Sequence, residues 1–314
     1  MAKILANTKD MPREEWLGLR RQGIGGSDAA TLLNLNPYDS LLGLWAEKKG
    51  LLAEKADTFP MALGRAFEGL VAGMWMEQTG RRVRQDHHLY QHEQAPWMLG
   101  NIDRRVIGEN AGLECKTTGR FERMAFEDGT VERYYAAQCQ WYMMVCGFER
   151  MYLAVLDRVS GRFAHYTVAP DIEQQQDLYD RAEWFWRECV LADCPPEPDG
   201  SEACGQVIRQ LYPGRAELGL AALDGCAGDL AEYAALGKQK KAIEERQKLL
   251  AQQVQMVMGD CTKGAAGGYK VSWAPQVRRS VDAKALEADL PQVYRRYVRE
   301  SQSRVFRVTA GKSA

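Results

Sequence analysis

The sequence predicts a mixed α/β (α+β) protein with a core in residues 1–195 and a C-terminal extension in residues 196–314. Of the 314 residues, 46% are hydrophobic and 26% are charged, which supports a sizeable core and excludes a disordered or fibrous chain. Helical and strand-like patterns alternate in the order α-α-β-β-β-α-β-β-α as far as Leu191. Proline, glycine and acidic residues then crowd the segment Cys194–Gly200, which ends the preceding helix and marks the boundary.

Two helices are expected early in the core. Apolar residues recur at helical spacing in residues 38–50 and 61–80, and each run ends on a glycine. Three short runs of strand type follow, in residues 82–90, 98–106 and 112–117. Glycines between the last two runs provide a turn, so the pattern predicts a three-stranded meander.

The second half of the core continues this mixture. Residues 131–146 predict a helix, and residues 151–156 and 163–168 predict two strands joined by a turn. Asp171 is a suitable cap for a further helix that runs toward Leu191. These elements complete the predicted core.

The extension, which we expect to pack on the core, begins with an amphipathic helix or helical hairpin over residues 223–258. Its apolar residues are spaced by seven, at Leu236, Ile243, Leu250 and Val257, but the intervening positions are mostly polar, which argues against a full coiled coil. Strands are expected at residues 269–273 and 305–308, with a short helix between them at residues 282–297.

Cysteine usage and hydropathy indicate a cytoplasmic protein without a membrane partner. The eight cysteines contain no C-x-x-C pair, which is typical of reduced thiols in the cytosol and not of a disulfide scaffold. No stretch approaches the roughly 18 apolar residues of a membrane span, and residues 1–10 lack the apolar region of a signal peptide.

The charge balance excludes a protein that holds nucleic acid by overall basicity. The formal net charge is −1, from 41 Lys and Arg residues against 42 Asp and Glu residues. A local imbalance lies between Arg278 and Arg307, where eight basic residues meet four acidic ones. We interpret it first as a solvated charged face, although a local basic channel stays possible.

Three charged residues point to phosphate chemistry. Glu114 and Lys116 alternate along a predicted strand and must share one face of it. If the strand of residues 98–106 pairs beside them, Asp103 brings a second carboxylate next to Glu114, and Glu68 on the preceding helix could add a third. Such acids suit a hard divalent ion, while the lysine offsets transition-state charge and orients or deprotonates a water. The alternative is an exposed charged pair without chemistry.

Motifs in residues 13–190 resemble one nuclease family. They include Gly23-Ile-Gly-Gly-Ser-Asp-Ala-Ala30, Asn36-Pro-Tyr38, Gly64-x-x-x-Glu68, Gly100-Asn-Ile-Asp103, Glu114-Cys-Lys116 and Tyr135-Ala-Ala-Gln-Cys-Gln140. In this order they are similar to the YqaJ-type viral recombinases, phage alkaline exonucleases related to lambda exonuclease within the PD-(D/E)xK nuclease superfamily. The resemblance implies a restriction-endonuclease-like core, with a central mixed sheet flanked by helices.

The resemblance also implies roles for individual residues. Glu68, Asp103, Glu114 and the backbone carbonyl of Cys115 match the metal-binding groups, Lys116 matches the catalytic lysine, and the metal would be Mg²⁺ at a two-ion site, with Mn²⁺ able to substitute. Residues matching a pocket for the terminal 5′-phosphate are Trp16, Arg20, Ser27, Gln138 and Asn101, the last standing where lambda-type enzymes have a smaller hydroxyl residue.

Ser27 and Gln138 of this pocket, and the neighbouring Asp28, also have simpler interpretations. The glycines before Ser27 could only form the turn before a helix capped by Ser27 or Asp28. Gln138 could be a buried, hydrogen-bonded amide, and Asp28 could pair with Arg20 or Arg21 and not approach the metal.

By this resemblance the protein is a Mg²⁺-dependent 5′-to-3′ exonuclease of linear double-stranded DNA with 5′-phosphorylated ends, encoded by a phage or prophage and acting in the bacterial cytoplasm. It would form a homotrimeric ring and leave 3′ single strands for a single-strand annealing protein. Two alternatives are a structure- or site-specific endonuclease on the same core, and a non-catalytic DNA-binding scaffold that recruits an annealing protein.

Overall fold

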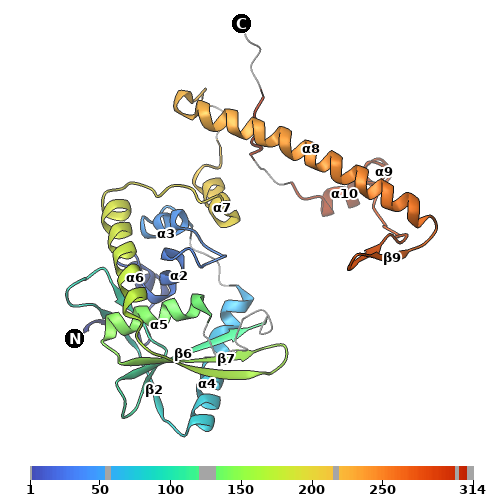
Figure 1. Ribbon diagram of the computed structural model, residues 1–314. Helices are drawn as coiled ribbons and strands as arrows, with labels where there is room; N and C mark the ends of the chain where they lie inside the picture. The colour runs from blue at the N-terminus through green and yellow to red at the C-terminus, as the bar shows by residue number, and fades with distance from the viewer. Residues whose placement is uncertain (1, 54–57, 120–131, 215–218, 301–303, 310–314) are drawn as a thin grey trace. The chain divides into compact units, whose positions relative to one another are not determined.

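The computed structural model describes residues 2–53, 58–119, 132–214, 219–300 and 304–309, in two compact units, Met1–Tyr212 and Pro213–Ala314 (Figure 1). The first unit extends beyond the predicted boundary at residue 195. It includes α7 (Glu202–Leu211), because Cys204 and Val207 of this helix are buried in its hydrophobic core. The proline-rich segment therefore joins two parts of one unit.

The first unit is built around helices and strands whose bounds are, in chain order, β1 (Lys3–Asn7), α1 (Arg13–Arg20), the 3-10 helix η1 (Gly26–Asp28), α2 (Ala29–Leu32), α3 (Leu41–Lys48), α4 (Phe59–Thr79), β2 (Val83–Gln85), β3 (His88–Gln91), β4 (Leu99–Gly100), β5 (Arg104–Val106), β6 (Ala111–Thr118), α5 (Arg133–Cys146), β7 (Arg150–Asp157), β8 (Phe163–Val168), α6 (Ile172–Trp184) and a π-helix (Phe185–Leu191), before α7. The predicted order is confirmed in outline from α3 to α6, with five short strands in place of three between α4 and α5. β1, α1, η1 and α2, which precede α3, were not part of the predicted order.

A five-stranded sheet in the order β2-β5-β6-β7-β8 forms the centre of the unit (Figure 1). β6 pairs with β7 in parallel, and the other neighbouring pairs are antiparallel. Alternate side chains of β7 enter two different cores: Leu153 packs in the cluster that includes α5, and Ala154 packs in the cluster that includes α4. Both faces of the sheet are thus covered by helices, which confirms the predicted mixed sheet flanked by helices.

The predicted three-stranded meander is divided between two sheets. β3 and β4 leave the central sheet and pair with β1 and each other, in the order β1-β3-β4. Between β2 and β3, the Asp86 carboxylate accepts hydrogen bonds from the His88 backbone N–H at 3.0 Å and from the Tyr90 hydroxyl at 2.7 Å. This turn redirects the chain, which a uniform strand pattern over residues 82–90 does not reveal.

Local capping holds the last long helix of the unit as predicted. The Asp171 carboxylate accepts the backbone N–H of Gln174 at 3.0 Å, which confirms the N-cap of α6. The helix then continues as a π-helix to Leu191, where Phe185 and Trp186 are buried. None of the helices in the described ranges is both long and apolar enough to cross a membrane.

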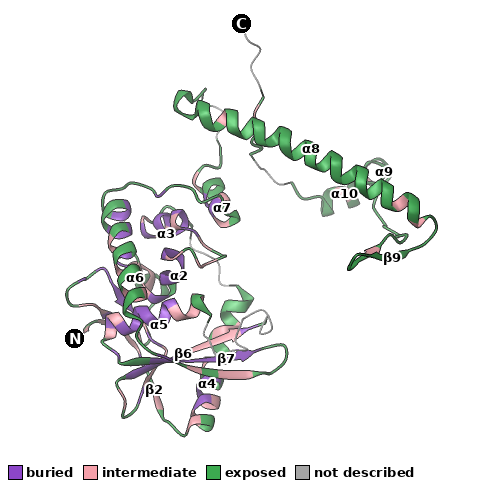
Figure 2. Ribbon diagram, in the orientation of Figure 1, coloured by how far each residue is buried: buried purple, intermediate pink, exposed green. Residues whose placement is uncertain are grey.

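The second unit contains a 3-10 helix η4 (Asp224–Cys226), α8 (Ala227–Met258), β9 (Lys263–Ala266), β10 (Tyr269–Ser272), α9 (Ala283–Asp289) and α10 (Pro291–Tyr297). Of the predicted alternatives, α8 is one long helix and not a hairpin, and Figure 2 shows it exposed along most of its length. β10 confirms the strand predicted at residues 269–273, and it pairs with β9, which was not predicted, in a hairpin with Gly267 and Gly268 at positive φ in the turn.

Two expectations for this unit are wrong. The helix predicted over residues 282–297 is two helices, because Pro291 disfavours helical geometry at Leu290, which has φ −134° and ψ 61°. The strand predicted at residues 305–308 does not form, since residues 304–309 have no assigned strand and no hydrogen-bonded neighbour strand in the described chain.

Replacing Leu178 with Ala tests the packing of α6 on the core. Leu178 is 0% exposed, so Leu178→Ala should lower the free energy of unfolding by about 2–5 kcal/mol. Ile172→Ala in the same helix is the control, because Ile172 is 72% exposed and its loss should cost less than about 0.5 kcal/mol. Denaturant unfolding followed by tryptophan fluorescence measures both, and equal costs would contradict this packing.

Candidate active site

The antiparallel register of β5 and β6 brings two acidic residues together. Arg104 pairs with Leu113 and Arg105 with Gly112, so the same register places Asp103, which precedes β5, beside Glu114. The Cys115 backbone N–H donates to the Asp103 carboxylate at 2.8 Å. The strand that follows Asp103 therefore pairs beside the strand of Glu114, which was the condition for the two carboxylates to meet.

Glu114 and Lys116 share the face of β6 that points toward α5. The Lys116 Nζ lies 2.7 Å from Oε1 of Glu114, and the Gln138 amide on α5 donates to the same oxygen at 2.8 Å. Leu113, which precedes Glu114 in the chain, points to the other face and is fully buried in the cluster that includes α4. The predicted alternation is thus observed. Glu114 is buried and Lys116 is half-buried, so the pair does not lie on a fully exposed strand face.

Glu68 reaches this cluster from α4 on the opposite side of the sheet. Its carboxylate forms a short ion pair with the Arg104 guanidinium, the residue next to Asp103. The Glu68 charge nevertheless acts on Asp103, whose pKa it helps to raise. The structure therefore brings together Glu68, Asp103, Glu114 and Lys116, as the sequence predicts.

Burial and mutual repulsion perturb the charges of the cluster. The pKa of Asp103 is raised well above its ordinary value by burial and then by the carboxylates of Glu114 and Glu68. Burial alone would lower the pKa of Lys116, but Glu114 and Asp103 raise it above its ordinary value. The neighbouring carboxylates thus favour the charged ammonium form of Lys116. Burial and the same repulsion between carboxylates disfavour the charged form of Asp103.

The donor set fits a divalent cation. Oε2 of Glu114 is buried and has no hydrogen-bond partner, and burial and the carboxylates of Glu114 and Glu68 raise the pKa of Asp103. As they stand, however, Glu68 pairs with Arg104 and Glu114 pairs with Lys116. In the described residues, no group of three or more His, Cys, Asp or Glu side chains is arranged to hold a metal ion. Metal binding by these residues stays a prediction.

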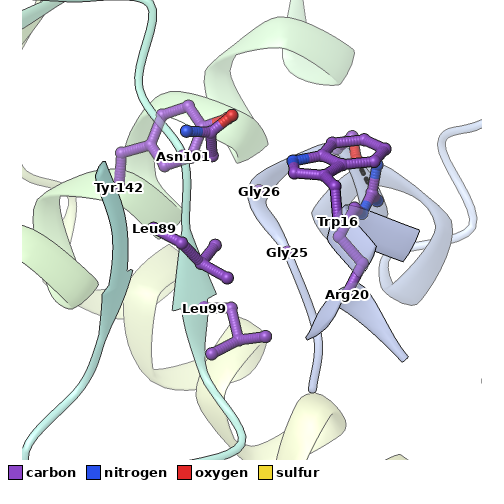
Figure 3. Close-up of a pocket in the computed structure, with 9 residues that line it drawn as sticks. Trp16, Arg20, Gly25, Gly26, Leu89, Leu99, Asn101 and Tyr142 are labelled. Carbon is purple, nitrogen blue, oxygen red and sulfur yellow. Dashed lines mark hydrogen bonds between the residues drawn. The ribbon is translucent and has the colours of Figure 1, made fainter. Parts of the chain in front are cut away.

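Four of the five predicted phosphate-pocket residues line one cavity of about 150 Å³. Figure 3 shows Arg20 and Trp16 on one side of this cavity, with Tyr142 and Asn101 on the other. The complete lining is Trp16, Arg20, Gly25, Gly26, Ser27, Leu89, Leu99, Asn101 and Tyr142. The Asn101 amide donates to the His88 carbonyl at 3.1 Å, which holds its side chain at the wall.

Gln138 is the exception, because it does not line the cavity. It is a buried, hydrogen-bonded amide, which donates to Oε1 of Glu114 at 2.8 Å and to the Tyr142 hydroxyl at 2.9 Å. Since Tyr142 is part of the cavity wall, Gln138 connects the cavity with the carboxylate cluster. The two groups of predicted site residues are therefore neighbours.

Arg20 is held in place on several sides. Its guanidinium lies 5.0 Å from the centre of the Trp16 ring and donates to the Ser27 hydroxyl at 2.8 Å and to Asp28 at 3.0 Å. Burial lowers the pKa of Arg20, but Asp28 and Glu47 more than compensate and raise it. A cationic guanidinium and a hydroxyl at a cavity wall are suitable donors for a phosphate.

Asp28 and Lys48 support this wall and were not among the predicted site residues. The Lys48 side chain is 0% exposed, and its Nζ lies 2.7 Å from Asp28, which also accepts the Gly25 backbone N–H at 3.0 Å. Burial would raise the pKa of Asp28, but Lys48 and Arg20 lower it to about 2. The signal was present: Lys48 continues the apolar spacing of Leu41, Leu44 and Trp45, where a core residue is expected.

These contacts decide between the simpler interpretations of the glycine motif. Asp28 pairs with Arg20, and its side chain makes no capping bond to α2. Gly26 is required by packing, because a Cβ there would lie 2.4 Å from Cε1 of Tyr142. The motif therefore forms both a tight turn and a wall of the cavity.

Comparisons with known proteins identify relatives of this chain. A family model described as the YqaJ-like viral recombinase domain matches residues 15–149. The chain is 32% identical over 315 residues to the uncharacterized protein YqaJ of Bacillus subtilis (strain 168), covering 97% of each chain. Protein D345L of African swine fever virus (strain Badajoz 1971 Vero-adapted) is 38% identical over 63 residues, which cover 19% of this chain and 18% of that protein.

Among solved structures, an alkaline exonuclease (LHK-Exo) from Laribacter hongkongensis is similar with a TM-score of 0.48 and 17% identity, covering 58% of this chain and 94% of that chain. A phage related exonuclease from Haemophilus somnus 129PT has a TM-score of 0.43 and 9% identity, covering 57% and 99%. The decisive similarity is to YqaJ, because it extends over almost the whole of both chains. Together with the domain match, it shows that the chain belongs to the YqaJ-like viral recombinase family.

Proposed function

We propose that this protein is a Mg²⁺-dependent 5′-to-3′ exonuclease of linear duplex DNA, which leaves 3′ single strands for recombination by strand annealing. The observation that carries the proposal is the Gln138 bridge, since one amide donates both to Glu114 and to the Tyr142 wall of the cavity. A cavity with Arg20 and Ser27 lies beside a cluster of acids in which Glu114 is buried and Glu68 and Asp103 are half-buried. This arrangement suits an enzyme that binds a terminal phosphate and hydrolyses the adjacent bond. Family membership supports a role in recombination.

Mg²⁺ would be held at one or two positions, with Mn²⁺ able to replace it. Its ligands would be Glu68, Asp103, Glu114 and the carbonyl of Cys115. The bound ion would polarise phosphoryl oxygens and lower the pKa of water. The buried, unpartnered Oε2 of Glu114 supports this assignment, as do burial and the neighbouring carboxylates, which raise the pKa of Asp103.

Lys116 would act through its charge. Its pKa is raised, so its ammonium group is available to stabilise the negative charge that develops on the phosphate, and less suited to remove a proton. Gln138 would hold the Glu114 carboxylate in one orientation, because it donates to Oε1 and leaves Oε2 open. Arg20 and Ser27 would bind the terminal 5′-phosphate, with Trp16 and Asn101 completing the pocket.

The family resemblance supports three further proposals, about the oligomeric state, the protein partner and the cellular location. The active form would be a homotrimeric ring around the duplex, which explains how a chain of net charge −1 stays on DNA. Its partner would be a single-strand annealing protein, and its location the cytoplasm of a bacterial host.

Polarity and metal dependence are tested with a linear duplex labelled at the 5′ or the 3′ end of one strand. With Mg²⁺ the 5′ label should be released first, and a chelator should stop release. Rapid nicking of a covalently closed circle would instead favour an endonuclease. Release that continues in the chelator would contradict the metal site.

Lys116→Ala should reduce strand hydrolysis by about 100- to 1,000-fold, because the substitution removes a fixed charge aimed at the scissile phosphate. Binding of the duplex in the presence of a chelator should change little. Lys9→Ala is the control, since Lys9 is exposed and is not among the site residues. A Lys116→Ala enzyme as fast as the parent would remove Lys116 from the mechanism.

Arg20→Ala should reduce the preference for 5′-phosphorylated over 5′-hydroxyl ends by about 10- to 100-fold, the value of a charge-assisted hydrogen bond. Hydrolysis of the 5′-hydroxyl duplex should fall much less, which separates lost recognition from lost folding. Arg21→Ala, an exposed neighbour, serves as the matched control. Unchanged preference in Arg20→Ala would show that the cavity does not bind the terminal phosphate.

A further inference from the structure

Charge is divided unequally between the two units. Residues 1–212 contain 24 Lys and Arg residues against 31 Asp and Glu residues, whereas residues 213–314 contain 17 against 11. The net charge of −1 therefore conceals an acidic first unit and a basic second unit. Asymmetry of this kind points to a polyanionic partner for the basic part.

The excess is concentrated in the segment from Arg278 to Arg307, here called the basic segment, with eight basic and four acidic residues. On α8, Lys240 and Lys241 lie near Glu244 and Glu245 one turn away, at 3.8 and 3.9 Å. By contrast, within the described residues no ion pair forms at Arg295, Arg296 or the other exposed arginines before residue 300, which are Arg278, Arg279 and Arg299. Their charges are therefore not neutralised by carboxylates among the described residues.

Aromatic rings are exposed within and beside the basic segment. Tyr297 and Phe306 are each 70% exposed, and Trp273, just before the segment, is 46% exposed. The Arg296 guanidinium lies 5.6 Å from the centre of the Tyr297 ring, so charge and ring are presented together. The Phe306 ring also packs edge-on against Tyr233 of α8, with the ring centres 5.4 Å apart. Solvation explains exposed arginines, but it does not explain the exposed rings of Tyr297 and Trp273.

We propose that the basic segment binds single-stranded DNA, with arginines on the phosphates and aromatic rings against the bases. Basic surfaces with exposed aromatic residues are the usual means of binding single strands, because every unpaired base has a face on which a ring can stack. A duplex hides these faces, so the aromatic residues favour a single strand as the partner. The choice of partner rests in part on the proposed function, whose product is a 3′ single strand.

Arg295 and Arg296 are the most informative positions. They lie in the last turn of α10, next to Tyr297, where their charge also stabilises the helix end. Tyr294, on the other side of this helix, is half-buried, so the pair of arginines occupies the solvent side. Substitution there changes the surface and leaves the packed residues intact.

The test measures binding of a fluorescent oligothymidylate with a 5′-hydroxyl end to the full chain by anisotropy, in a chelator. The double variant Arg295→Glu, Arg296→Glu should bind about tenfold or more weakly, and the slope of log affinity against log salt should fall by about 1.4, at 0.7 per phosphate contact. Lys238→Glu, Lys248→Glu on α8 is the matched control, with the same change in charge on exposed lysines. Its affinity should stay near that of the parent.

Tyr297→Ala provides a second variant, which should weaken single-strand binding about tenfold without changing the salt slope. Unchanged affinity in both the arginine and the tyrosine variants would overturn the proposal, as would equal losses in the arginine variant and the α8 control. A loss confined to a duplex probe would assign the segment to double-stranded DNA and also overturn it. Because binding is measured without hydrolysis, this result is independent of whether the chain is an exonuclease.

Discussion

The pairing of β5 with β6 is the constraint on which the candidate site depends. Its register places Asp103 beside Glu114 and lets the Cys115 backbone N–H hold the Asp103 carboxylate. Carboxylates this close repel each other, and burial adds to the cost, which is why the pKa of Asp103 is raised. A fold keeps such a cluster only if something compensates the charge. Lys116 and Arg104 do so in part, and the open oxygen of Glu114 shows where compensation is incomplete.

A second buried network gives the cavity its shape. Lys48 and Asp28 form an ion pair inside the protein, and removing two charges from water is costly unless both are fully paired. Asp28 meets that condition by accepting from Lys48, Arg20 and the Gly25 backbone. The result is that Arg20 is fixed at the cavity wall, between Asp28 and the Trp16 ring. We interpret this buried pair as a means of positioning Arg20 and not as a source of stability.

The two networks meet at Tyr142 and Gln138 on α5. Gly26 leaves room for the Tyr142 ring, whose hydroxyl accepts from Gln138, which in turn orients Glu114. A change on the cavity side of α5 is therefore expected to reach the carboxylates.

The second unit is of a different kind: its surface is basic and its helices α8, α9 and α10 bury little, which suits contact with an extended polyanion.

Much of the first unit and its acidic cluster could be predicted from the sequence, because they follow from local patterns. Alternation along β6 decides that Glu114 and Lys116 share a face, and helical spacing locates α4 and α5 within a few residues. The order of the family motifs identified Glu68, Asp103, Arg20 and Ser27 as candidate site residues. Only the tertiary structure decided that Asp86 turns β3 into a second sheet, that Lys48 is buried against Asp28, and that Gln138 reaches Glu114 and not the cavity. These facts depend on contacts between residues far apart in the chain, and no local periodicity carries that information.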